Sequence, residues 1–159
     1  MKTNHSMDVL YEEIRQGKLD DSRDLPQKLV ALLNGGFVEE EQCLFLRLLK
    51  KGPVKRADFP DRTAYECFVN HIHIEDYLDN GGLPPLEMLG RAVALARELK
   101  ARLSQLHGDR HFRIIVAFSG ANCTVRFHTI RPDQEWIDKA ARGFGPEATC
   151  IFETQELEP

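Results

Sequence analysis

Residues 123–131 carry the sequence CTVRFHTIR, in which apolar and polar side chains alternate. Successive side chains of a β-strand point to opposite faces of a sheet. The alternation therefore predicts a strand with Val125 and Phe127 facing a core, and with Arg126 and His128 on the opposite, polar face.

A second alternating segment, residues 67–75, has the sequence CFVNHIHIE. As a strand it would bury Ile72 and Ile74 and leave His71, His73 and a following glutamate on the other face. If the two strands are neighbours, their polar faces form one surface of three histidines, a guanidinium and a carboxylate.

The region 61–79 also fits a helix, because its apolar residues recur at helical spacing between positions 65 and 72. A pair of glycines at 81 and 82 would end that helix. Short apolar runs are ambiguous between helix and strand. We favour the strand, and the helix is the alternative. In a helix, His71 and His73 would point to different sides and the shared surface would not form.

The elements after residue 67 follow the order β-α-β-β-α-β. A long helix is indicated by apolar residues at three- and four-residue steps between 86 and 106. The order predicts an α+β, ferredoxin-like fold, in which a four-stranded antiparallel sheet carries two helices on one face and the first and third strands are neighbours. The expected elements are strands at 67–75, 112–118, 123–130 and 147–154 and helices at 85–107 and 132–142.

The first sixty residues predict helices at 6–16, 25–34 and 38–51. The third opens with three glutamates at 39–41 and ends at Lys50 and Lys51, a charge order that suits a helix dipole. We therefore expect a helical N-terminal region over residues 1–60 and an α+β sheet domain over residues 61–159.

One hydrophobic core is expected to join the long helix, the strands and the second helix of the sheet domain. Its predicted members are Leu99, Leu103, Ile114, Val116, Trp136 and Ile151.

Charge and composition restrict the class of partner. The formal net charge is −4, and all of it falls in residues 61–159, because the first sixty residues hold ten acidic and ten basic side chains. An acidic surface does not attract a phosphate backbone. The basic cluster at residues 50–56 lies where a helix end explains it. We expect no nucleic-acid partner and instead another protein, with a basic surface.

The four cysteines are isolated in apolar runs, which indicates reduced thiols. The start of the chain has no signal-like apolar stretch, and no run approaches the roughly 20 apolar residues that span a bilayer. The expected location is cytoplasmic, with no membrane association.

The histidines allow two interpretations. His71, His73 and His128, completed by Glu75, have the ligand types of a zinc or iron site. A polar, solvent-facing sheet surface explains the same residues without a metal. We therefore predict no metal and no other cofactor.

Arg113, Arg126 and Arg131 are suited to bind an anion. Cross-strand pairing with Glu75, Asp76 or Glu153 is the favoured explanation. Cys123 and Ser119 lack the surroundings of an activated nucleophile, so no catalytic residue is predicted.

The sequence therefore favours a non-enzymatic protein-binding module, of the kind that a toxin-neutralising immunity protein or another inhibitor represents. The alternative is a small metal-binding protein or enzyme that uses the histidine cluster. The expected partner-binding residues are His71, His73, Glu75, Asp76, Asp79, Arg126 and His128.

Overall fold

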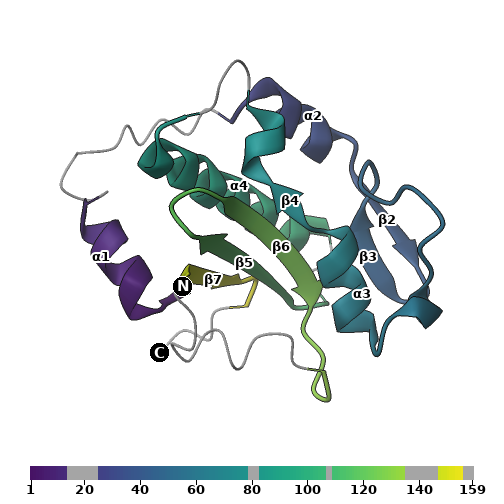
Figure 1. The fold of residues 1–159 in the computed structure, drawn as a ribbon. Helices are drawn as coiled ribbons and strands as arrows, with labels where there is room; N and C mark the ends of the chain where they lie inside the picture. Colours follow the sequence, from purple (N-terminus) through teal and green to yellow (C-terminus); the bar gives the residue numbers. More distant parts are fainter. Residues whose placement is uncertain (14–24, 79–82, 107–108, 135–146, 156–159) are drawn as a thin grey trace.

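The computed structural model describes residues 1–13, 25–78, 83–106, 109–134 and 147–155, and it combines helices with antiparallel sheet (Figure 1). The fold class is therefore α+β. The elements are β1 (Lys2–Thr3), α1 (His5–Glu13), α2 (Gln27–Asn34), β2 (Phe37–Glu40), β3 (Cys43–Leu46), the 3₁₀ helix η2 (Arg56–Asp58), α3 (Arg62–Val69), β4 (Ile72–His73), the 3₁₀ helix η3 (Ile74–Tyr77), α4 (Pro85–Leu106), β5 (Phe112–Phe118), β6 (Cys123–Thr129) and β7 (Ala148–Glu153).

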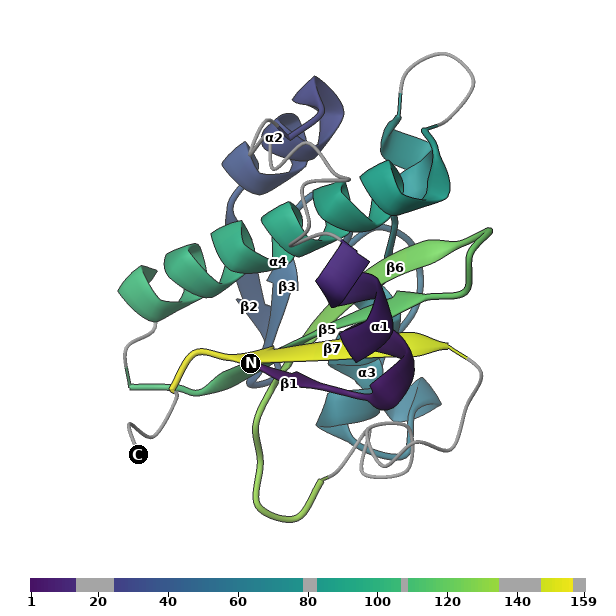
Figure 2. The same cartoon turned by 90° about the vertical axis from the view of Figure 1, so that its left-hand side faces the viewer.

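Five strands form the main sheet in the order β1-β7-β5-β6-β4, and every neighbouring pair is antiparallel. The long helix α4 lies across one face of this sheet, as Figure 2 shows. The apolar sides of α4, β5, β6 and β7 make one buried core, because side chains recur at helical spacing in α4 and alternate in the strands. The predicted long helix and the three strands at 112–118, 123–130 and 147–154 are confirmed to within one residue at each end.

The ferredoxin-like topology is not confirmed, because the strand order differs. The first and third strands of the motif, β4 and β6, do pair as expected. The last strand, β7, pairs with β5 on one side and β1 on the other rather than with β4. With two residues, β4 offers too little backbone to pair with a second full strand.

The segment 67–75 is part helix and part strand. Asp61 caps α3 by accepting a hydrogen bond from the Ala64 amide at 2.7 Å, and the helix runs to Val69. The expected strand 67–75 is therefore confirmed only at Ile72–His73, since Ile74 and Glu75 belong to the 3₁₀ helix η3. The expected pairing is confirmed for Ile72, which lies opposite Val125 and is buried.

The helix predicted at 38–51 is wrong: residues 37–46 form the hairpin β2–β3. Glu41 and Gln42 form its two-residue turn, with φ angles of 51° and 61°, as the tight turns of hairpins require. All four residues of β3 are buried. A strand buried on both faces shows no alternation, so the apolar run was mistaken for a helical stripe.

The N-terminal segment joins the main sheet. Lys2 lies opposite Ile151 and Thr3 opposite Cys150, and α1 packs against β7. Helix α2 falls within the predicted range and ends at Gly35, after which Gly36 takes a φ of 71°. The part of the predicted helix 6–16 beyond Glu13 lies outside the described residues. The division at residue 60 stays a prediction.

The predicted core is confirmed for four members, Leu99, Leu103, Ile114 and Val116, which are buried in one cluster. Ile151 lies on the other face of the sheet, opposite Ile115, because the strand register gives these two residues the same parity. Trp136 and most of the helix expected at 132–142 lie outside the described residues. In the described part of the chain, no helix is both long and apolar enough to cross a membrane.

Candidate functional site

Glu66 of α3 is fully buried and joins the hairpin to the main sheet. Its carboxylate accepts hydrogen bonds from the amide of Leu44 in β3 and from the amide of Thr129 in β6, both at 2.8 Å. The Arg131 guanidinium pairs with the same carboxylate in a two-pronged contact, at 2.7 and 3.1 Å. A carboxylate this deeply buried is stable only with such partners, because desolvation of an unpaired charge is costly.

Asn70, which caps the end of α3, makes the second connection, four residues after Glu66. Its Oδ1 accepts from the Leu46 amide at 3.0 Å, and its Nδ2 donates to the carbonyls of Leu44 and Phe127 at 2.9 and 3.3 Å. Residues four apart lie on one face of a helix. The two side chains therefore bond the backbone edges of β3 and β6 at once, as a strand between them would do. We call Glu66, Asn70 and Arg131 the polar bridge.

Sequence reasoning missed the polar bridge. Arg131 was considered for an anion clamp or for pairing with acids in other segments, and its actual partner is Glu66. The signal in the sequence is a glutamate and an asparagine four residues apart within an otherwise apolar segment. That spacing places them on one helical face but gives no information on which strands they meet.

Five of the seven expected partner-binding residues lie in or next to β4, the end strand of the main sheet, or on its neighbour β6. His71, half-buried, lies with its Nε2 3.0 Å from Nη2 of Arg126, and its ring centroid is 4.2 Å from that of the exposed His73. Asp76 is exposed and Glu75 half-buried in the 3₁₀ helix that follows. We call His71, His73, Glu75, Asp76 and Arg126 the edge surface.

The electrostatics of the edge surface hold His71 in its neutral form. Burial lowers the pKa of this imidazole to about 4, and the neighbouring charges of Arg126 and His73 act in the same direction. Burial also lowers the pKa of Arg126. Neutral Nε2 can therefore accept the hydrogen bond that the guanidinium donates, which fixes both side chains.

Glu75 has two different carboxylate oxygens. Oε1 accepts a hydrogen bond from the Cys123 amide, the first residue of β6, and so ties the 3₁₀ helix to the sheet. Oε2 is buried, and none of the described residues bonds it.

His128 does not belong to the edge surface. It was expected to face outward, but it is 1% exposed, and its Nδ1 bonds the Thr129 carbonyl oxygen at 2.8 Å. Burial lowers the pKa of its imidazole, and no described residue bonds its Nε2. Asp79, the remaining expected residue, lies outside the described residues. Among the described residues, no three histidine, cysteine or acidic side chains are placed to hold a metal ion.

Arg113 and the four cysteines lie in surroundings that give them structural roles. Arg113 pairs across the sheet with Glu153 at 2.7 Å, as the strand register places them opposite each other and as expected. All four thiols are buried, and burial raises the pKa of Cys43 to about 11 and that of Cys150 to about 12. A thiol nucleophile needs a lowered pKa, so these side chains act as small apolar groups.

The arrangement defines an α+β protein with a buried polar bridge and a mixed-charge surface at one sheet edge. Its sequence places it in the Uncharacterized protein PM0498 family, which matches residues 2–154. A curated relative, "Uncharacterized protein PM0498" of Pasteurella multocida (strain Pm70), is 26% identical over 107 residues, a match that covers 60% of this chain. The match covers 64% of the relative's length, less than two thirds. No solved structure matches the chain.

Proposed function

We propose that the protein is a non-enzymatic binding module, of the immunity-protein or inhibitor type, whose edge surface binds a partner protein with cationic groups. The observation that carries the proposal is the gathering of His71, His73, Arg126 and Asp76 at the end strand of the sheet. We also propose that the protein is cytoplasmic. That the whole protein binds such a partner is likewise part of the proposal.

The geometry of the edge surface supports binding in preference to catalysis. Its Arg126–His71 contact is already made, at 3.0 Å, and fixes two side chains before any partner arrives. Binding to side chains that are already ordered costs less conformational entropy. The lowered pKa of His71 disfavours the protonated form that a general acid requires, and the hydrogen bond from Arg126 occupies the Nε2 lone pair that a general base would use.

Charge supports a cationic partner. Asp76 is exposed at the rim of the surface. A lysine or arginine of the partner can pair with its carboxylate. Charges of this kind at a rim raise the association rate and set specificity.

The test has two stages. The partner is isolated from the native host with the full chain as bait, identified, purified and titrated by calorimetry against wild type, Asp76→Lys and His73→Ala. We expect Asp76→Lys to weaken binding by about tenfold or more, the effect of a residue that contributes substantially to an interface.

The matched control is Asp133→Lys, which reverses another exposed carboxylate, in the turn after β6. It should bind as wild type does, and thermal unfolding of each variant checks that the fold is kept. Equal weakening by both variants would indicate a general charge effect. A turnover activity that His71→Ala abolishes would instead place the protein among enzymes.

A further inference from the structure

A row of contacting aromatic rings extends from the core to a second surface, beside the hairpin. Phe45 and Tyr65 are fully buried and meet edge to face, with ring centroids 4.9 Å apart. Phe59 stacks on Tyr65 at 5.1 Å, and Phe68 contacts Phe59 at 5.1 Å. Phe68 is 57% exposed. An aromatic ring backed by packed rings is held in place, although most of its own surface faces water.

Phe68 is distinct among the exposed large apolar side chains of the described residues. The others are Met1, Val9, Val30 and Leu48, none of them aromatic. Single exposed apolar residues are common and need no explanation. Aromatic residues, however, are the ones that most often supply binding energy at interfaces, particularly where packing fixes their position.

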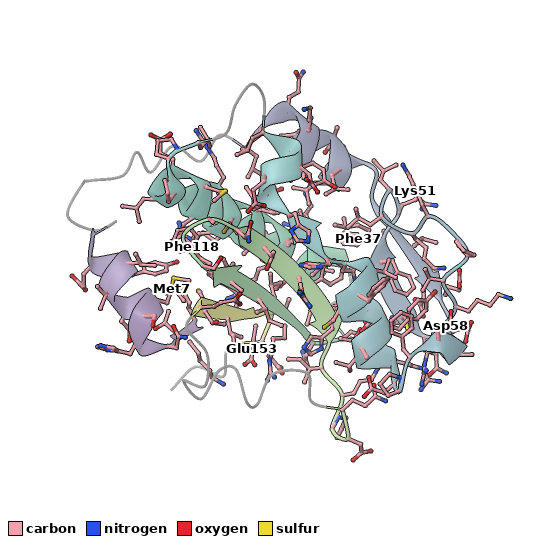
Figure 3. All side chains as sticks on the ribbon, in the orientation of Figure 1. Met7, Phe37, Lys51, Asp58, Phe118 and Glu153 are labelled. Carbon is pink, nitrogen blue, oxygen red and sulfur yellow. The ribbon has the colours of Figure 1, made fainter. Side chains whose placement is uncertain are left out.

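The segment next to these aromatic rings is basic, although the protein as a whole is acidic. Residues 50–62 contain five lysines and arginines and two aspartates, in a chain with a net charge of −4. Both aspartates bond the local backbone. Asp58 accepts a hydrogen bond from the Lys55 amide at 2.8 Å, and Asp61 caps α3. Lys51 and Lys55 are exposed. Figure 3 shows Lys51 and Asp58 on the hairpin side of the molecule, far from Met7.

Two of the basic residues hold the local backbone in position. Arg56 donates from Nη1 to the Phe59 carbonyl oxygen at 2.7 Å, which fixes the turn that presents the Phe59 ring. Lys50 pairs with Glu40 at 3.1 Å and lies over the rings of Phe45 and Tyr65. The exposed Lys51 and Lys55 belong to the same short segment as these two anchored side chains.

We propose that Lys51, Lys55, Arg56, Phe59 and Phe68, the aromatic–basic surface, bind an acidic segment of a protein partner. An apolar side chain of that segment covers Phe68, and its carboxylates pair with the lysines and with Arg56. This surface is separate from the edge surface and has the opposite charge preference. The inference therefore does not depend on the proposed function, and its test is separate.

The experiment uses the full chain and a short fluorescein-labelled peptide of glutamates around a central Leu-Phe pair, followed by fluorescence anisotropy. We expect saturable binding that weakens by about tenfold or more in Phe68→Ala and in Lys55→Glu. The affinity should also fall as salt rises, since exposed charges are screened.

The matched control is Val9→Ala, which removes an exposed apolar side chain, 51% exposed, from α1. It should leave binding unchanged, and thermal unfolding should show that all variants fold. Failure of the peptide to bind would overturn the proposal, as would binding that survives both Phe68→Ala and Lys55→Glu. Tighter binding of a labelled oligouridine than of the peptide would also overturn it, in favour of single-stranded RNA, whose bases stack on aromatic side chains.

Discussion

The main sheet with α4 and the hairpin with α3 are held together in different ways. In the sheet, the contact between α4 and the strands is made by apolar side chains such as Leu99, Ile114 and Phe127, all fully buried. The hairpin adds Leu44 and Leu46 to the same apolar core, and it is also joined to the sheet through α3, where Glu66 and Asn70 are buried among backbone amides and carbonyls. The apolar contact tolerates substitutions that conserve side-chain volume. The polar contact needs donor and acceptor atoms at fixed positions.

The difference decides how much a local change should cost in each region. Removing a methylene group from the apolar core leaves a cavity but no unpaired polar group. Removing Glu66 or Asn70 from the polar bridge leaves backbone amides buried and unpaired, which costs more than the bond itself contributed. The three predictions that follow test this contrast, from the largest expected effect to the smallest.

Glu66→Ala should destabilise the protein by about 3–5 kcal/mol, because it leaves the amides of Leu44 and Thr129 without their acceptor and Arg131 without its carboxylate partner. Urea unfolding measures the loss as a lower midpoint. The control is Glu98→Ala, which removes a partly exposed pair with Arg102, four residues along α4, and should cost less than about 1 kcal/mol. Equal losses in the two variants would contradict the importance of the polar bridge.

Leu99→Ala, in the fully buried centre of α4, should cost about 3 kcal/mol through the cavity that it leaves. The unfolding transition should stay a single cooperative step, because no polar group loses its partner. A loss of less than about 1 kcal/mol in the same urea assay would show that the core collapses around the deletion, and that apolar packing here is looser than the burial indicates.

His71 should make stability pH-dependent in the acid range. Its pKa is lowered to about 4 in the folded protein, by burial and by Arg126 and His73, from an ordinary value of 6.5. Above pH 6.5 both states are neutral and His71 contributes nothing to the pH dependence. As the pH falls from 6.5 to about 4, the unfolded state takes up the proton first and stability is lost.

The loss should be smaller in His71→Gln, and urea unfolding at several pH values measures the difference. Because the imidazole is only half-buried, the slope should stay well below the limit of about 1.4 kcal/mol per pH unit for one group. A His71 imidazole that titrates near 6.5 by NMR would contradict the close contact with Arg126.

The sequence predicted most of the main sheet, because local patterns suffice there. Alternation placed β5, β6 and β7, helical spacing placed α4, and pairing logic brought Arg126 beside His71. Alternation also gave the direction of His128 but not its burial, since parity says which way a side chain points and not what covers it. The short β4 was extended too far because α3 occupies the first half of the same apolar run.

The hairpin could not be predicted because the information that specifies it lies elsewhere in the chain. Leu44 depends on Glu66, 22 residues away, and Glu66 depends on Thr129, 63 residues away. No window of neighbouring residues contains these partners. The omission of the aromatic–basic surface follows from the same wrong element. The sequence explains its lysines as the end of a helix at 38–51, and that helix does not form.

Native-state hydrogen exchange at the amides of Leu44 and Leu46 tests most directly whether the polar bridge joins the hairpin to the sheet. These amides donate to Glu66 and Asn70 and not to a neighbouring strand. We predict that they exchange as slowly as the amide of Val116 in the centre of β5, and that Asn70→Ala speeds exchange at Leu46 far more than at Val116. Fast exchange of Leu44 and Leu46 in the wild-type protein would contradict the account.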